Sequence, residues 1–106
     1  MTQQRPFALL VVDVQNDFCP GGALGVRNGD AVIAPLNRMI EWTERHGGTV
    51  YATRDWHAAD TAHFKAYGGI WPVHCVQRTA GADFHEDLRL PADAIVVSKG
   101  DRQQPV

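Results

Sequence analysis

The chain has 106 residues, enough for one small domain. Its apolar content of 44% and charged content of 21% are those of a folded globular protein and argue against wholesale disorder. The net charge of −2 gives no reason to expect nucleic acid or a membrane surface as a partner, and the first apolar run stops at Asp13, too short for a membrane span, so a cytoplasmic location is expected.

The run Phe7–Val14 predicts a strand. It is continuously apolar and rich in valine and leucine, as are strands that are buried on both faces of a parallel sheet. Asp13 is the exception, and a carboxylate near the end of a buried strand is costly unless it has a partner. Asp13 is therefore either a strand-end residue that caps the next turn or a catalytic carboxylate with a raised pKa.

The segment Asn28–His46 predicts an amphipathic helix, because its apolar residues recur at intervals of three and four. Gly47 and Gly48 end the helix, and Gly48–Thr53 predicts a second strand. A strand, a helix and a strand form a βαβ unit, and sites in open α/β sheets form at the carboxyl ends of the strands. Asp13 and Asp55 both lie at such ends, so we expect one crevice to hold both.

Carboxylate and imidazole groups gather in the stretch Thr53–Cys75. Asp55 and His57 follow the second predicted strand, and residues two apart in an extended chain project to the same side. His63 and His74 come later in the same stretch. Carboxylate and imidazole together suit a divalent cation such as Zn²⁺, Fe²⁺ or Mn²⁺, so a metal site is the leading hypothesis here.

Two irregular segments follow the second strand. The 17 residues Ala58–His74 have no clear periodicity and predict an excursion over the site. Val76–Leu90 also predicts a loop, with a short helical turn near Asp83–Leu88. His85 has no carboxylate-bearing strand end beside it in the sequence, which favours a structural or surface role.

The short β-branched run Asp93–Ser98 predicts a third strand, with Lys99 at its carboxyl end. Lys99 is then the third ionisable residue in that position. A lysine beside a buried carboxylate holds it ionised and stabilises a developing negative charge. The alternative is an ordinary exposed lysine at a strand end.

Five motifs in order along the chain carry a family resemblance. They are Asp13-Val-Gln-Asn-Asp-Phe-Cys-Pro-Gly-Gly22, Arg54-Asp-Trp-His57, Trp71-Pro-Val-His-Cys-Val76, Gly81-Ala-Asp-Phe-His85 and Lys99-Gly100. Together they resemble the cysteine amidohydrolases of the isochorismatase-like superfamily and, within it, the nicotinamidases (pyrazinamidases). The resemblance implies an α/β fold with a parallel sheet in a three-layer α/β/α arrangement.

The resemblance also implies a reaction, the hydrolysis of nicotinamide to nicotinate and ammonia. In this family a cysteine thiolate attacks the amide carbonyl, and water cleaves the resulting thioester. The aspartate that accepts the thiol proton and returns it to the leaving ammonia corresponds to Asp13. The catalytic lysine corresponds to Lys99.

A metal site and a substrate pocket follow from the same resemblance. The divalent metal is expected to hold the pyridine nitrogen of the substrate, directly or through water. Its ligands correspond to Asp55, His57 and His74, while His63 stands where only some members have a further ligand. The substrate-binding positions are Phe18, Leu24 and Trp71.

The nucleophilic cysteine of the family lies in a later part of the domain, and both Cys19 and Cys75 match non-nucleophilic positions. Residues 1–106 are therefore expected to be the N-terminal portion of a single isochorismatase-like domain, truncated after about the third strand. A parallel sheet needs helices on both faces, and one helix cannot cover both. We expect another chain to complete it, either the missing C-terminal fragment or a second copy in a homo-oligomer.

Two alternatives stay open. The chain belongs to another amidohydrolase of the same superfamily, or it is a metal-binding fragment without catalysis. Isochorismatases proper lack the metal ligands, so Asp55, His57 and His74 argue against that particular activity.

Overall fold

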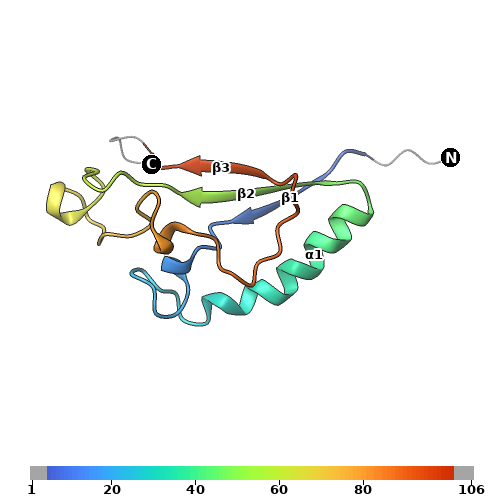
Figure 1. Ribbon diagram of the computed structural model, residues 1–106, viewed down its shortest axis with the longest axis horizontal. Coiled ribbons are helices and arrows are strands. Elements are labelled where there is room, and N and C mark those ends of the chain that lie inside the picture. Colours follow the sequence, from blue (N-terminus) through green and yellow to red (C-terminus); the bar gives the residue numbers. More distant parts are fainter. Residues whose placement is uncertain (1–4, 102–106) are drawn as a thin grey trace.

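The computed structural model describes residues 5–101. Three strands, β1 (Ala8–Val12), β2 (Thr49–Asp55) and β3 (Ile95–Lys99), form one parallel sheet in the order β1-β2-β3 (Figure 1). The helix α1 (Ile33–Arg45) connects β1 to β2. Short 3-10 helices lie at Asn16–Phe18, Gly29–Val32, Lys65–Tyr67 and Ala80–Ala82. The predicted parallel α/β sheet is confirmed.

The helix begins in two stages. A 3-10 turn at Gly29–Val32 precedes the α-helical hydrogen bonding of α1, and Asn28, in the left-handed conformation with φ of 58°, makes no capping hydrogen bond through its side chain. Gly47 follows the helix with φ of 76°, a conformation that costs glycine little. The C-terminal end of the helix was thus predicted correctly, because a single glycine at one position is enough to indicate it.

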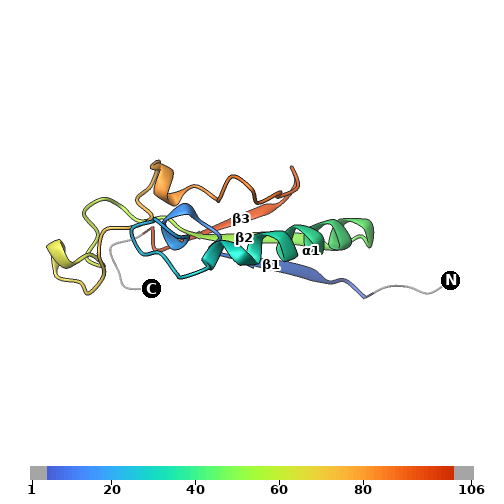
Figure 2. The same ribbon diagram turned by 90° about the horizontal axis from the view of Figure 1, so that it is seen from below.

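The hydrophobic core lies between one face of the sheet and α1. Figure 2 shows α1 crossing in front of the strands, seen from the side of the sheet that it covers. Apolar side chains of β1 and β2 meet those of the helix, and the segment that leads into β3 closes the cluster with Leu88. The buried members are Val11, Val14, Ile33, Ile40, Val50, Ala52 and Leu88. The alternation of Val11 with Leu10 and Val12 decides which β1 side chains reach this core.

The opposite face of the sheet is open. Leu10 and Val12 are 63% and 61% exposed, and Ile95 and Val97 of β3 are also exposed. Within residues 5–101, α1 is the one α-helix and packs on one face only, so the prediction that one helix cannot cover both faces is confirmed, and β1, whose composition suits a strand buried on both faces, is buried on one.

The connection from β2 to β3 is irregular over most of its length. The predicted helical turn near Asp83–Leu88 is a single hydrogen-bonded turn from His85 to Leu88 and no helix, and a 3-10 helix lies just before it at Ala80–Ala82. No helix among the described residues is long and apolar enough to cross a membrane.

Candidate active site

The carboxyl ends of the three strands meet at one edge of the sheet. The register pairs Val12 with Thr53 and Asp55 with Lys99, so the residues that end or follow the strands face one another. The Nζ atom of Lys99 donates to Asp13 Oδ2 at 2.7 Å and to Asp55 Oδ1 at 2.6 Å. The parallel topology therefore brings Asp13, Asp55 and Lys99 into one ionic cluster.

The electrostatics of this cluster favour a charged lysine. Burial lowers the pKa of Lys99, but its hydrogen bonds and ion pairs with Asp13 and Asp55 outweigh that effect and leave the pKa raised. Lys99 is therefore an ammonium ion at neutral pH. Its charge compensates the two carboxylates, which lie in a partly buried setting.

Asp13 is held in an uncommon backbone conformation. Its φ is 55°, which costs a non-glycine residue on the order of 1 kcal/mol. Its N–H still donates to the Thr53 carbonyl at 3.1 Å, and the Thr53 hydroxyl donates to Asp13 Oδ1 at 2.7 Å. With Lys99 on Oδ2, both carboxylate oxygens have fixed donors, so the surroundings keep the strained conformation in place.

A second set of side chains converges on the other oxygen of Asp55. Asp55 Oδ2 lies 3.6 Å from His57 Nε2 and 3.7 Å from His74 Nε2. Each residue offers a ligand atom that lies within 4.8 Å of the others, and this is the one such group among residues 5–101. Both histidine side chains are 4% exposed.

The hydrogen bonds of the two imidazoles determine which nitrogen faces Asp55. His57 Nδ1 lies 2.9 Å from the Gly100 carbonyl, and His74 Nδ1 lies 2.7 Å from the Pro72 carbonyl. A carbonyl oxygen only accepts, so each Nδ1 carries a proton and a neutral ring presents the Nε2 lone pair to Asp55. Burial lowers the pKa of His57 despite the opposing Gly100 bond and Asp55 charge, which favours that neutral ring.

The resulting arrangement fits a cation. A carboxylate oxygen and the lone pairs of two imidazoles face one another in a buried position, where acceptors without a shared donor repel. Two nitrogens and one oxygen are suitable ligands for zinc, and histidines held through Nδ1 by backbone carbonyls are the usual outer support of such sites. The donor set therefore has the chemistry of a divalent metal site.

His63 lies beside this group and outside it. Its ring centroid is 4.9 Å from that of His57, and its Nδ1 lies 2.6 Å from the Thr61 hydroxyl. Its Nε2 is buried and has no hydrogen-bond partner. An unpartnered buried nitrogen is costly, and the group that could hold a metal does not include His63, whose role as a further ligand stays a prediction.

A pocket opens above these groups. It has a volume of about 280 Å³ and joins the ionic cluster to the histidines. Its lining residues are Phe18, Leu24, Asp55, His57, Trp71, His74 and Lys99, and we call it the metal-site pocket. The three positions predicted for substrate contact thus lie together over the predicted ligands. Asp13 lines a neighbouring pocket of about 220 Å³ that shares Phe18.

The sequence reasoning missed Asp17, which connects three loops of the site. Its Oδ2 accepts the Cys75 N–H at 2.8 Å, directly after His74, and its Oδ1 accepts the Ala23 N–H at 3.2 Å. A Cβ on Gly81 would overlap the same carboxylate. The available signal was the run of polar residues Gln15-Asn16-Asp17 directly after an apolar strand, where sites of α/β sheets form.

Neither cysteine has the properties of a nucleophile. Cys75 is fully buried, and burial followed by the charges of Asp17, Asp55 and Asp13 raises its pKa to about 12. Cys19 is also buried, and burial followed by the charge of Asp30 raises its pKa. A thiol attacks as the thiolate, so both are poor candidates.

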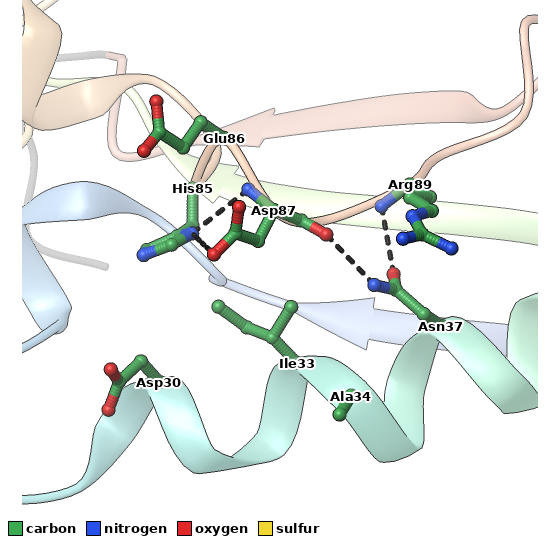
Figure 3. Close-up of a pocket in the computed structure, with 8 residues that line it drawn as sticks. All are labelled: Asp30, Ile33, Ala34, Asn37, His85, Glu86, Asp87 and Arg89. Carbon is green, nitrogen blue, oxygen red and sulfur yellow. Dashed lines mark hydrogen bonds and ion pairs between the residues drawn. The ribbon is translucent and has the colours of Figure 1, made fainter.

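A larger pocket lies elsewhere, between α1 and the loop that precedes β3 (Figure 3). It has a volume of about 380 Å³, and we call it the helix groove. Its lining residues are Asp30, Ile33, Ala34, Asn37, His85, Glu86, Asp87 and Arg89. Its carboxylates and His85 do not form a group of ligand atoms close enough together to hold a metal ion. Its larger size alone therefore does not make it the candidate site.

The chain belongs to the isochorismatase family, because residues 7–102 match the Isochorismatase domain. It is 41% identical to the nicotinamidase of Escherichia coli (strain K12) over 91% of this chain and 52% of that protein. It is 43% identical to the nicotinamidase/pyrazinamidase of Mycobacterium tuberculosis over 88% of this chain and 51% of that protein. The chain spans about half the length of these curated relatives.

A solved structure shares the fold. The pyrazinamidase of Pyrococcus horikoshii in complex with zinc superposes with a TM-score of 0.90 at 44% identity, over 96% of this chain and 56% of that one. The family resemblance stated from the sequence motifs is thereby confirmed. The roles of the individual site residues remain predictions.

Proposed function

We propose that this chain supplies the metal site and the Asp13–Lys99 pair of a nicotinamidase, an amidohydrolase that converts nicotinamide to nicotinate and ammonia. One observation carries the proposal: the two oxygens of Asp55 are divided between Lys99 and a pair of histidine lone pairs, beneath a pocket with aromatic walls. The named relatives support the choice of substrate, and the zinc in the solved pyrazinamidase supports the choice of metal.

In this proposal Asp55, His57 and His74 hold a divalent metal, with His63 as a further ligand. A metal held there would supply a Lewis acid for the pyridine nitrogen of the substrate. The aromatic side chains of Phe18 and Trp71, together with Leu24, flank the ring. A pocket lined this way excludes water from one end of a flat heteroaromatic amide and leaves its carboxamide near Lys99.

Asp13 and Lys99 handle charge and protons at the amide end. Asp13 takes the proton of the attacking thiol and returns it to the amide nitrogen, which leaves as ammonia. Lys99 donates to Asp13 Oδ2 and compensates the charge of the carboxylate. The thiolate itself comes from neither Cys19 nor Cys75. In the proposal it belongs to the other half of the domain, because a second copy of this chain would bring only the same two cysteines.

The test measures bound zinc and ammonia release from nicotinamide, on the 106-residue chain and on the product of the gene extended past codon 106. We expect both proteins to bind zinc and only the longer one to release ammonia. A longer product that binds zinc without hydrolysing nicotinamide favours a different amide substrate or a non-catalytic metal site. Ammonia release by the 106-residue chain contradicts the exclusion of its two cysteines.

Asp13→Asn separates the two halves of the proposal. It keeps the side-chain shape but cannot accept a proton, so we expect hydrolysis by the longer product to fall by about 100-fold or more. Zinc content should stay at the wild-type level, because Asp13 does not reach the ligand atoms. Atomic absorption and an ammonia assay measure both quantities on the same sample.

A further inference from the structure

Gln15 is a fully buried amide at the side of the candidate metal site. Its Nε2 donates to the Asp55 carbonyl at 2.8 Å and to the Ala82 carbonyl at 2.9 Å, and its Oε1 accepts the Asp55 N–H at 2.9 Å. The side chain therefore satisfies both backbone groups of Asp55 and ties them to the turn at Ala82. All of its contacts cross long sequence distances.

The sheet itself explains why Asp55 needs these bonds. The β1 register ends where Val12 pairs with Thr53, so no β1 backbone lies beside Asp55. On the other side of β2 the ladder continues, since the Trp56 N–H donates to the Lys99 carbonyl at 2.8 Å. The Gln15 amide has the donor and acceptor of a peptide group, and it takes the place that one more residue of β1 would occupy.

We propose that Gln15 is a positioning residue for the metal site. By fixing the backbone of Asp55 it sets the direction of a carboxylate whose two oxygens serve two different partners, Lys99 and the histidines. A small rotation of that backbone would move Oδ2 away from the lone pairs of His57 and His74. The inference rests on the proposed metal site, because it takes Asp55 as a ligand.

Asn37 provides a matched control. Its amide makes the same pair of backbone bonds, donating to the Asp87 carbonyl at 2.8 Å and accepting the Arg89 N–H at 2.8 Å (Figure 3). It thus ties α1 to a loop of the helix groove and touches no proposed ligand. A residue that matters only for general stability should resemble Asn37 in every measurement.

The experiment compares Gln15→Met, which keeps length and volume without the hydrogen bonds, with Asn37→Leu. We measure the Kd for Zn²⁺ by competition with a chelator, the absorption spectrum of bound Co²⁺, and the thermal midpoint. Gln15→Met should weaken zinc binding by about 10- to 100-fold, the usual effect of losing an outer support, and should shift the Co²⁺ bands. Asn37→Leu should lose thermal stability while both metal readouts stay at the wild-type values.

Each contrary outcome has a distinct meaning. A wild-type Kd and Co²⁺ spectrum in Gln15→Met overturn the positioning role, whatever happens to its melting temperature. A wild-type chain that binds no zinc overturns the metal site, and this role with it.

A measurement on the unaltered chain covers the case in which Gln15→Met does not fold. Hydrogen exchange of the Asp55 amide is followed by NMR, with and without zinc. If Gln15 holds this backbone in advance, the amide is already protected before zinc is added. An Asp55 amide that exchanges freely until zinc arrives overturns the inference.

Discussion

The metal-site pocket and the helix groove contain the same kinds of side chain, yet they differ in what those side chains can do. Each has histidine, carboxylate and a basic residue, and the helix groove is the larger of the two. In the metal-site pocket the imidazoles are 4% exposed, whereas the His85 side chain is 20% exposed and its neighbour Asp87 is 74% exposed. Burial thus separates the two regions before any ligand is considered.

The backbone hydrogen bonds separate them further. Carbonyl groups bind Nδ1 of His57 and of His74, which leaves the Nε2 lone pairs directed at Asp55. In the helix groove the Asp87 N–H donates to His85 Nδ1 at 3.1 Å, so that lone pair is already used within the loop. The tautomer imposed by the local backbone, and not the list of residue types, thus decides whether histidines form a ligand set.

The largest expected effect is on Zn²⁺ affinity, when one histidine in each region is replaced by alanine. His74→Ala should weaken Zn²⁺ binding by more than about 100-fold, because it removes one of three protein ligands. His85→Ala should change the Kd by less than about twofold. Isothermal titration of both variants measures this difference.

Equal losses of affinity in the two variants would contradict the comparison, since they would mean that His85 binds zinc as well. Unchanged affinity in His74→Ala would remove the ligand assignment itself.

The next largest expected effect is on the free energy of unfolding, when the basic residue of each region is replaced by methionine. Lys99→Met leaves Asp13 and Asp55 without their shared partner, so the free energy of unfolding should fall by about 1–2 kcal/mol at pH 7, the partial exposure of the lysine reducing the loss. Arg89→Met, in the exposed groove, should cost less than about 0.5 kcal/mol. Urea unfolding monitored by circular dichroism gives both values.

Added zinc should recover part of the stability lost in Lys99→Met, because the cation also compensates Asp55. A Lys99→Met chain as stable as the wild type would show that the two carboxylates do not depend on the ammonium ion.

The smallest expected effect is on the pH dependence of stability and appears only in alkaline solution. It distinguishes the two buried thiols, Cys75 and Cys19. The pKa of Cys75 is raised from 9.0 to about 12, so above pH 9 the unfolded chain loses this proton while the folded chain keeps it. The stability that this thiol contributes is complete below pH 9 and is lost as the pH rises towards 12. Cys75→Ala should therefore flatten the decline of stability above pH 9.

Cys19→Ala is the matched variant, because burial, followed by the charge of Asp30 of the helix groove, also raises the pKa of that thiol. Thermal midpoints measured between pH 8 and pH 11 give the two slopes, at pH values chosen around the ordinary thiol pKa of roughly 8.5 to 9. A steeper slope for Cys75→Ala than for the wild type would contradict the sign of the effect.

Much of the fold and of the candidate site followed from local patterns. The apolar run at Ala8–Val12 and the β-branched run at Ile95–Lys99 are strands, and Gly47 ends the helix. The parallel topology then requires Asp55 and Lys99 to meet, because carboxyl ends of parallel strands share an edge. The sequence was sufficient to predict a feature wherever a single residue type, or the spacing of apolar residues, determines the local conformation.

The remaining features depend on contacts between distant segments. The exposure of Leu10 and Val12 depends on which helices cover the sheet, and the pattern of apolar residues within the strand does not indicate it. The bonds from Gln15 to Asp55 and from Asp17 to Cys75 join residues 40 and 58 positions apart. The 3-10 turn at Ala80–Ala82 packs against the loop of Asp17 and has no periodicity of its own.

The shared carboxylate of Asp55 limits how this centre can be redesigned. One oxygen binds Lys99, and the other faces His57 and His74. Any substitution there alters the ammonium pair and the cation site together, so the preferred metal cannot be changed at Asp55 without also disturbing the proton chemistry. A designer who wants a different metal must work through the imidazoles, because their other hydrogen bonds are to the backbone carbonyls of Gly100 and Pro72 and do not involve Lys99.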